Sequence, residues 1–243
     1  MKQVIIIPAR YGSTRFPGKP LVQLFGKPLI QHVYERALES GLKEVYVATD
    51  DKRIFDTVVD FGGKAVMTGE HPSGTDRIWE AANILGLASE TLIINLQGDQ
   101  PLFPSEYFSL LLKPLLFSTE LSMATLAVPI HSKKDLDNPH KVKVVLDKKG
   151  RALYFSRSPI PFFRPPGKEP IYLKHIGVYA YRKEFLDIFV RLPLGELEQA
   201  EKLEQLRALE YGYSIAVSLV PRDIPEVDTP EDLEIVKTCW EKL

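Results

Sequence analysis

Short apolar runs alternate along this chain with longer segments in which apolar residues recur every three or four positions. The runs are rich in Val, Ile and Leu, which is typical of strands that are buried on both faces of a sheet. The longer segments have the spacing of helices with one apolar side. The alternation predicts an α/β fold with a mixed, mostly parallel central sheet and helices on both faces. The expected strands of this sheet are residues 4–7, 44–49, 65–67, 91–96, 123–128 and 214–220.

Prolines and acidic residues predict where several of these elements begin and end. We expect Pro8 to end the first strand, because proline has no N–H to donate to a neighbouring strand. Asp50 is placed to cap a helix that continues to Phe61. Leucine and alanine recur every third residue over 197–209 and predict one helix there. The other expected helices are residues 29–38, 104–117 and 229–240.

The alternation of apolar runs with helical segments changes near residue 130. Residues 143–156 predict two strands that are joined by a turn at 148–150. Five prolines in residues 158–170 predict a stiff loop, and residues 172–181 predict a further strand. We therefore expect one domain over residues 1–243, with an antiparallel insertion that forms a smaller subdomain at about 130–210.

Candidate chemistry begins directly after the first strand. Residues 8–21 contain glycines, prolines and three cations, namely Arg10, Arg15 and Lys19. A loop at the carboxyl end of a strand in an α/β sheet is a usual ligand site, and glycine lets backbone amides approach an anion. Two interpretations are open at this point: a cradle for a triphosphate, or an ordinary polar loop with solvated charges.

Composition narrows the classes of function. The formal net charge of −1 argues against a broadly basic surface for nucleic acid. The single cysteine, Cys239, excludes an internal disulfide and a cysteine-rich zinc site. We find no leader sequence at residues 1–8 and no apolar run near the roughly 20 residues that span a membrane. We therefore expect a cytoplasmic protein without a membrane or nucleic-acid partner.

Two aspartates could bring a metal ion to this loop. Asp99 follows a buried strand, which places it at the same sheet edge as Arg10 and Lys19 if the strands are parallel. A carboxylate that faces a phosphate site needs a cation between the two, and Mg²⁺ accepts carboxylates together with phosphate oxygens. Asp228 is a second candidate ligand. For each aspartate the alternative is a structural role, in a turn or at the start of a helix.

The residues of two further segments, taken alone, give little evidence of a function. Residues 72–77 supply hydroxyls and a glycine before a helix, which is typical of a helix start. His175 lies in an expected strand, where a packed histidine is an alternative to a functional one.

Taken together, these segments resemble the CMP-KDO synthetases, the 3-deoxy-manno-octulosonate cytidylyltransferases. The resemblance rests on the loop at 8–21, on 73–77, on Gln97-Gly98-Asp99, on 227–233 and on segments of the insertion, in order from residue 4 to about 233. The sequence departs mildly from the family pattern at Asp76, which fills an acidic position, and more clearly at two further positions. Gln100 stands where we expect Glu, and Glu226 stands where many relatives have Gly.

The resemblance implies a nucleotide-diphospho-sugar transferase-like fold and a reaction in which CTP and 3-deoxy-D-manno-octulosonate (KDO) give CMP-KDO and pyrophosphate. It implies catalytic roles for Arg10, Lys19, Asp99 and Asp228, with Asp99 and Asp228 as ligands of Mg²⁺. It implies nucleotide contacts from Arg10, Ser13, Lys19, Ser73, Gly74, Arg77 and Gln97. It implies sugar contacts from Gln97, Arg157, Arg164, His175, Tyr179, Glu204 and Gln205.

The resemblance also implies a homodimer and a place in lipopolysaccharide biosynthesis. Two alternatives stay open: a related nucleotidylyltransferase for another acid sugar or a sugar phosphate, and a non-catalytic nucleotide sensor. A dinucleotide oxidoreductase is disfavoured, because the Gly-x-Gly-x-x-Gly motif is absent from the sequence.

Overall fold

The computed structural model describes residues 1–12, 16–168 and 170–240. The chain forms two compact units. The first unit comprises Met1–Ser109, Tyr181–Val190 and Ile224–Leu243, and the second comprises Leu110–Ala180 and Arg191–Asp223.

The first unit contains a parallel sheet with the strand order β6-β1-β4-β5. Its strands are β1 (Gln3–Ala9), β4 (Val45–Thr49), β5 (Ala65–Met67) and β6 (Leu92–Asn95). Residues 4–7 are wholly buried, as expected for a central strand that is covered on both faces. The predicted mostly parallel α/β core is confirmed.

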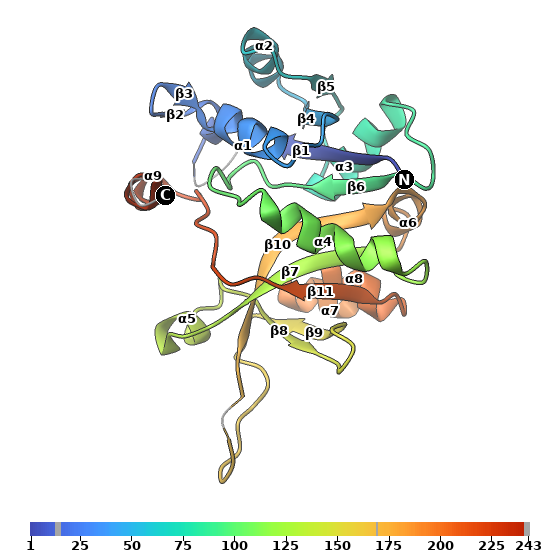
Figure 1. Cartoon of the computed structure of the whole chain (residues 1–243), viewed down its shortest axis with the longest axis vertical. Coiled ribbons are helices and arrows are strands. Elements are labelled where there is room, and N and C mark those ends of the chain that lie inside the picture. The colour runs from blue at the N-terminus through green and yellow to red at the C-terminus, as the bar shows by residue number, and fades with distance from the viewer. Residues whose placement is uncertain (13–15, 169, 241–243) are drawn as a thin grey trace. The chain divides into compact units, whose positions relative to one another are not determined.

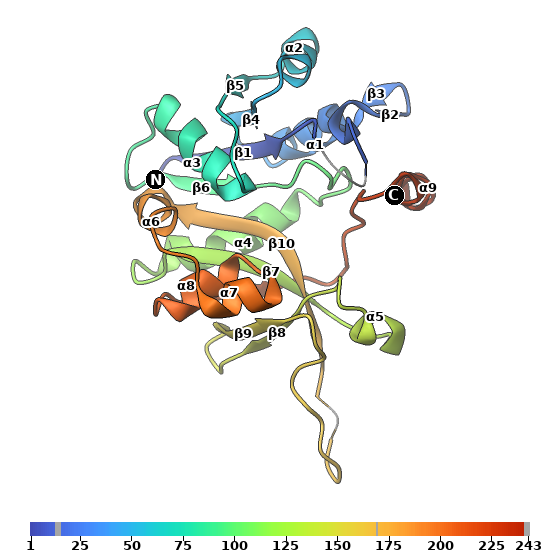
Figure 2. The same ribbon diagram turned by 180° about the vertical axis from the view of Figure 1, so that it is seen from behind.

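Helices cover both faces of this sheet. Helix α1 (Leu29–Leu38) and helix α3 (Gly74–Ile84) lie on opposite faces, as Figures 1 and 2 show from the two sides. The remaining elements of the unit are the 3-10 helix η1 (Lys19–Leu21), strands β2 (Gln23–Leu24) and β3 (Lys27–Pro28), and helices α2 (Lys52–Asp60), α6 (Lys183–Phe189) and α9 (Pro230–Trp240).

The prediction that Pro8 ends the first strand is wrong. Strand β1 continues to Ala9, and Pro8 is in register with Ala48 of β4. Ile5 donates its N–H to the β4 side and Ile6 accepts from the β6 side, so the Pro8 nitrogen faces β6. The register with β6 ends at Ile6, and proline therefore removes no hydrogen bond there.

The prediction that Asp50 caps the next helix is also wrong. The side chain of Asp51 accepts a hydrogen bond from the backbone N–H of Arg53 at 2.9 Å and so caps α2. Asp50 instead accepts a hydrogen bond from the Arg77 guanidinium at 2.6 Å. The two neighbouring aspartates thus have different roles. Both are good capping residues, so the sequence pattern alone could not show which of them caps the helix.

The second unit contains the predicted antiparallel insertion. Strands β7 (Met123–Pro129) and β11 (Ile215–Leu219) are parallel, within the order β11-β7-β10. Strand β8 (Lys143–Leu146) pairs antiparallel with both β9 (Ala152–Ser156) and β10 (Leu173–Arg182), which confirms the prediction. Helix α4 (Glu106–Phe117), which belongs mostly to this unit, and the pair α7 (Glu196–Glu201) and α8 (Gln205–Glu210) cover opposite faces. A short helix, α5 (Lys133–Asp137), follows β7.

The single helix predicted for residues 197–209 is interrupted. Lys202 has a left-handed backbone with φ of 53° and ends α7, and α8 begins three residues later. The carbonyl groups of Glu201 and Lys202 accept hydrogen bonds from the Arg157 guanidinium at 2.6 and 3.2 Å. A tertiary contact therefore satisfies the end of α7, where the apolar spacing alone predicted a continuous helix.

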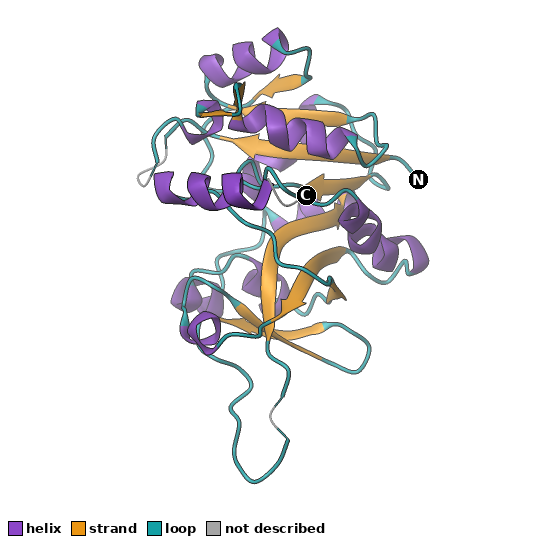
Figure 3. Cartoon of the chain, turned by 60° about the vertical axis from the view of Figure 1, so that its left-hand side comes forward, coloured by secondary structure: helices purple, strands orange, loops and turns teal. Residues whose placement is uncertain are grey.

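Residues 158–168 form the predicted proline-rich loop and contain neither helix nor strand. Figure 3 draws these residues, which follow β9, as a loop. Across the described parts of the chain, none of the helices combines the length and the apolar character that a membrane crossing requires.

Candidate active site

A cavity of about 350 Å³ lies in the first unit at the carboxyl ends of β1 and β6. Its walls come from the loop after β1, the start of η1, the start of α3, the turn after β6 and the segment before α9. Adjacent parallel strands end at the same edge of a sheet, so the loops that follow them meet there. The predicted residues on this cavity are Arg10, Lys19, Ser73, Gly74, Arg77, Gln97, Asp99 and Asp228. Ser13 and Arg15 lie outside the described residues.

Two glycines allow the chain to approach itself closely around this cavity. A Cβ on Gly98 would lie 3.1 Å from the Pro8 carbonyl oxygen, so glycine lets the turn after β6 sit against the end of β1. Gly18 has φ of 70°, and its N–H donates to the Tyr11 carbonyl at 3.0 Å. This bond closes the loop after β1 and places Lys19 at the first position of η1.

The Lys19 ammonium group lies between the two predicted metal ligands. Its Nζ is 2.8 Å from Asp99 Oδ2 and 3.5 Å from Asp228 Oδ1. The side chains are 16%, 25% and 40% exposed, respectively, so the cluster is partly shielded and open to the cavity. Three charged groups from distant parts of the sequence therefore converge at one point.

Asp228 is held at the start of α9 by its neighbours. The Asp232 carboxylate accepts hydrogen bonds from the backbone N–H groups of Asp228 and Thr229 at 2.9 and 2.8 Å. Asp232 thus serves the amides at this helix start, while the Asp228 carboxylate meets Lys19. This arrangement favours the interpretation of Asp228 as a functional carboxylate over that of a purely structural one.

The pair Asp99 and Asp228 fits the donor set of Mg²⁺. Magnesium in proteins is usually held by one or two carboxylates, together with substrate phosphates and water. Within residues 1–12, 16–168 and 170–240, no cluster of three or more His, Cys, Asp or Glu side chains forms a metal cage of protein ligands alone. The predicted site would therefore need oxygens from a bound nucleotide, and Mg²⁺ stays a prediction.

The start of α3 forms another wall of the cavity. Ser73 caps this helix, since its side chain accepts a hydrogen bond from the Asp76 N–H at 3.1 Å. Arg77 is only 3% exposed, and its guanidinium donates to Asp50 at 2.6 Å and to Thr68 at 2.7 Å. Arg77 fixes the loop after β5 to α3, and its predicted contact with a nucleotide is untested.

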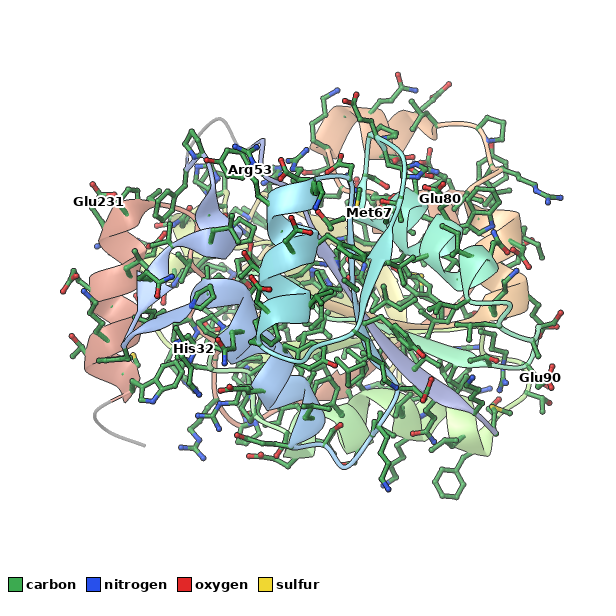
Figure 4. The ribbon with its side chains drawn as sticks, turned by 90° about the horizontal axis from the view of Figure 1, so that it is seen from above. His32, Arg53, Met67, Glu80, Glu90 and Glu231 are labelled. Carbon is green, nitrogen blue, oxygen red and sulfur yellow. The ribbon has the colours of Figure 1, made fainter. Side chains whose placement is uncertain are left out.

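His71 lines the same cavity and was missed by the sequence analysis. Its Nε2 is 2.5 Å from Glu80 Oε2, and that oxygen also accepts the Gly69 N–H at 2.8 Å. The pKa of the Glu80 carboxyl is lowered, chiefly by the hydrogen bond from His71. Figure 4 labels Glu80 on α3. The spacing of nine residues between His71 and Glu80 carries no local signal, so only the fold brings them together.

Tyr11 is also held by a residue that the sequence analysis did not single out. The Arg53 guanidinium carbon lies 3.3 Å from the centroid of the Tyr11 ring, and Asp51 binds Arg53 through two side-chain hydrogen bonds of 2.9 and 2.6 Å. Figure 4 labels Arg53 on α2. The stacked pair fastens the loop after β1 to the start of α2. Gln97, which lines the cavity, donates a hydrogen bond to Asn95 Oδ1 at 3.0 Å.

Most of the predicted sugar-binding residues lie in the second unit. The Arg157 guanidinium donates to the backbone carbonyls of Pro139, Glu201 and Lys202 at 3.0, 2.6 and 3.2 Å. Arg164 is exposed in the proline-rich loop. Arg157 thus has a structural role in the part of the chain that the structure describes, and a sugar contact from either arginine is untested.

His175 is buried within strand β10. Its ring lies between Phe155 and Tyr179, with centroid distances of 5.0 and 5.4 Å, and its Nε2 is 3.0 Å from Thr125 Oγ1. Burial lowers the pKa of His175 to about 3, and the neighbouring Lys174 contributes. His175 is therefore neutral at physiological pH and is packed as a core histidine, while its predicted sugar contact is untested.

Glu204 and Gln205 lie at the start of α8, and Gln205 is 5% exposed. Tyr179 is half-buried in β10 beside His175. The structure therefore brings His175 and Tyr179 together and places Glu204 directly before α8 and Gln205 at its first position. Their predicted sugar contacts remain predictions.

Comparison with known proteins places the chain in a family. The family model described as "Cytidylyltransferase" matches residues 4–218. An 8-amino-3,8-dideoxy-manno-octulosonate cytidylyltransferase of Shewanella pealeana is 58% identical over 238 residues, which cover 97% of each chain. A 3-deoxy-manno-octulosonate cytidylyltransferase of Syntrophobacter fumaroxidans is 55% identical over 239 residues, which cover 97% of this chain and 96% of that protein.

A solved structure agrees with these relatives. The structure of a CMP:2-keto-3-deoxy-manno-octonic acid synthetase in complex with CTP superposes with a TM-score of 0.94 and 48% sequence identity, over 100% of this chain and 99% of that one. The fold and the sequence identity over nearly the full length both agree. The chain belongs to the cytidylyltransferase family, among the 3-deoxy-manno-octulosonate cytidylyltransferases and their 8-amino counterparts.

Proposed function

We propose that this enzyme transfers CMP from CTP to KDO and releases pyrophosphate. The observation that carries the proposal is the position of Lys19 Nζ, 2.8 and 3.5 Å from carboxylate oxygens of Asp99 and Asp228 in one cavity. This is the combination that a nucleoside triphosphate with a divalent cation requires. The relatives named for cytidylyl transfer to octulosonates support the choice of substrates.

The reaction is a phosphoryl transfer, in which positioning and charge neutralisation dominate over covalent chemistry. The C2 hydroxyl of the sugar attacks the α-phosphorus of CTP in line, its proton is lost, and pyrophosphate leaves. Arg10 and Lys19 bind the triphosphate, and Lys19 stabilises the negative charge that develops on the leaving pyrophosphate. The loop after β1 supplies backbone N–H groups, and the predicted contact from Ser13 belongs to the same loop.

Asp99 and Asp228 would hold Mg²⁺ when the nucleotide is bound. The ion would supply charge neutralisation and lower the pKa of the attacking hydroxyl. Without nucleotide, Lys19 screens the repulsion between the two carboxylates. Both aspartates line the cavity beside it.

The remaining parts of the proposal concern the sugar and the cell. Gln97, Arg157, Arg164, His175, Tyr179, Glu204 and Gln205 are the proposed sugar contacts. Arginine suits the sugar carboxylate, because its planar fork forms two parallel hydrogen bonds. A homodimer in the cytoplasm that provides CMP-KDO for lipopolysaccharide synthesis completes the proposal.

A second candidate acceptor is 8-amino-3,8-dideoxy-manno-octulosonate. The observation that favours it is the 58% identity to the Shewanella enzyme named for that sugar, against 55% to the relative named for KDO. The two sugars differ at C8, far from the reacting C2 hydroxyl. The same chemistry at the α-phosphorus therefore serves both, and only the contacts at C8 distinguish them.

One assay tests both candidates. Purified protein is incubated with CTP and Mg²⁺ and with KDO, the 8-amino sugar or no sugar, and pyrophosphate release is measured. The proposal predicts release that depends on an octulosonate, with the higher kcat/KM for KDO. A higher kcat/KM for the 8-amino sugar selects the second candidate. Binding of CTP without release with either sugar contradicts both and supports a nucleotide sensor.

A further inference from the structure

Two side chains outside the cavity join the segments that carry Asp99 and Asp228. The Gln100 Nε2 donates a hydrogen bond to Glu226 Oε1 at 3.1 Å. Gln100 directly follows Asp99, and Glu226 precedes Asp228 by two residues. Residues near the two candidate metal ligands in the sequence are therefore in direct contact with each other.

Other contacts also connect the segments. The Val227 N–H donates to the Asp99 carbonyl at 2.9 Å. Val227 and Leu102 belong to one apolar cluster with Leu24, Leu29 and Val236. The Lys19 ammonium lies between the Asp99 and Asp228 carboxylates. The Gln100–Glu226 bond adds a direct contact between side chains of the two segments, and this contact depends on the identity of both residues.

The chemistry of the pair requires one amide and one carboxylate. Gln100 is 1% exposed, and its Oε1 has no hydrogen-bond partner among the residues that the structure describes. The amide is therefore oriented by its N–H group, which faces Glu226. A glutamate at position 100 would have no proton to donate and would place a second carboxylate against the first at a buried position.

We infer that Gln100 and Glu226 are positioning residues that set the separation of the Asp99 and Asp228 carboxylates. The inference rests on the proposed function, because it assigns these carboxylates to a metal-bound nucleotide. It adds two residues that are not among those lining the cavity.

The test exchanges the two side chains. Gln100→Glu should weaken the binding of Mg²⁺·CTP by about tenfold, which is within the range of interaction free energies between residues in contact. The affinity is measured by calorimetry without sugar. Gln100→Glu combined with Glu226→Gln restores an amide facing a carboxylate and should return the affinity to within about threefold of the parent. Glu226→Gln alone leaves two amides that can still pair, and its effect should be smaller than that of Gln100→Glu.

A matched control is available in the same unit. Gln31 donates to Glu35 Oε1 at 2.9 Å on α1, so Gln31→Glu makes the same change away from the cavity. This control should leave Mg²⁺·CTP binding unchanged. Melting temperatures are measured for all variants, because a merely structural role would lower the melting temperature without changing the affinity of the folded protein.

The outcomes separate the inference from the proposed function. Normal Mg²⁺·CTP affinity in a folded Gln100→Glu variant would overturn the inference, as would a folded double variant that fails to recover. If the parent binds Mg²⁺·CTP and the exchange behaves as expected but no sugar is converted, the choice of acceptor fails and the inference holds.

Discussion

The polar residues that were predicted for function have different surroundings in the two units. In the first unit, Arg10, Lys19, Asp99 and Asp228 come from segments up to 218 residues apart and line one cavity. In the second unit, Arg157 binds three backbone carbonyls and His175 is buried among aromatic rings. The order of the strands brings residues at the edge of the sheet together. In the insertion, arginine and histidine side chains instead make hydrogen bonds and packing contacts that stabilise the insertion itself.

The strongest test of the first half of this comparison is the loss of a carboxylate. Asp99→Asn keeps the size of the side chain and removes its charge, so we expect turnover to fall by about 1,000-fold with little change in melting temperature. Pyrophosphate release at saturating CTP and Mg²⁺ measures the effect. Asp56→Asn, on the exposed side of α2 and paired with Lys52, is the matched control. Turnover of Asp99→Asn near the parental rate would show that the Asp99 carboxylate is not needed for catalysis.

Lys19 should separate nucleotide binding from the sugar step. Lys19→Met keeps most of the side-chain volume and removes the ammonium group, and we expect kcat/KM for CTP to fall by about 100-fold. Stopped assays over a range of CTP concentrations, at fixed sugar, give this value. The KM for the sugar should change much less. An unchanged kcat/KM for CTP would contradict the placement of the triphosphate on Lys19.

Arg157 tests the second half of the comparison. Arg157→Ala removes three hydrogen bonds to carbonyl groups, and we expect the free energy of unfolding to fall by about 2 kcal/mol. Urea denaturation measures the loss. If the variant keeps its stability and only its KM for the sugar rises, Arg157 is a binding residue without a structural role, and the contrast between the units fails there.

The effect of His175 is absent at neutral pH and appears only as the pH falls. The pKa of His175 is about 3 in the folded protein and about 6.5 when unfolded, so only the unfolded chain gains this proton between those values. Stability should therefore fall as the pH drops from 6.5 toward 3, by about 1.4 kcal/mol per pH unit from this group.

Urea denaturation of the parent and of His175→Gln, at several pH values from 8 to 4.5, isolates this contribution. Carboxylates contribute equally to both proteins, so the difference between the two slopes reports His175. Equal slopes would show that the imidazole reaches water or gains a proton in the folded chain, and would favour a functional over a packed histidine.

Much of the fold and of the first-unit site could be predicted because local pattern and topology agree. The buried strand before Asp99 and the strand before Arg10 are visible as apolar runs, and parallel order places their ends together. The resemblance to a known family then made Asp228 a candidate, although its local pattern indicated only a helix start, and the structure places it on the cavity.

The features that were missed depend on contacts between distant residues. Helix α6 (Lys183–Phe189), the break at Lys202 and the contact of His71 with Glu80 have no clear local signal. Asp51 rather than Asp50 caps α2, because Asp50 accepts a hydrogen bond from Arg77, which lies on α3. Apolar periodicity reports burial, and it does not report which polar partner a residue will find.

The most direct test of the central claim is a calorimetric titration of CTP, with and without Mg²⁺ and without sugar, into the parent and the Asp228→Asn variant. The account predicts that Mg²⁺ strengthens CTP binding to the parent, and that most of this gain is lost in the variant while its melting temperature stays near that of the parent. The same gain from Mg²⁺ in both proteins would show that Asp228 does not meet the metal-bound nucleotide and would contradict the account.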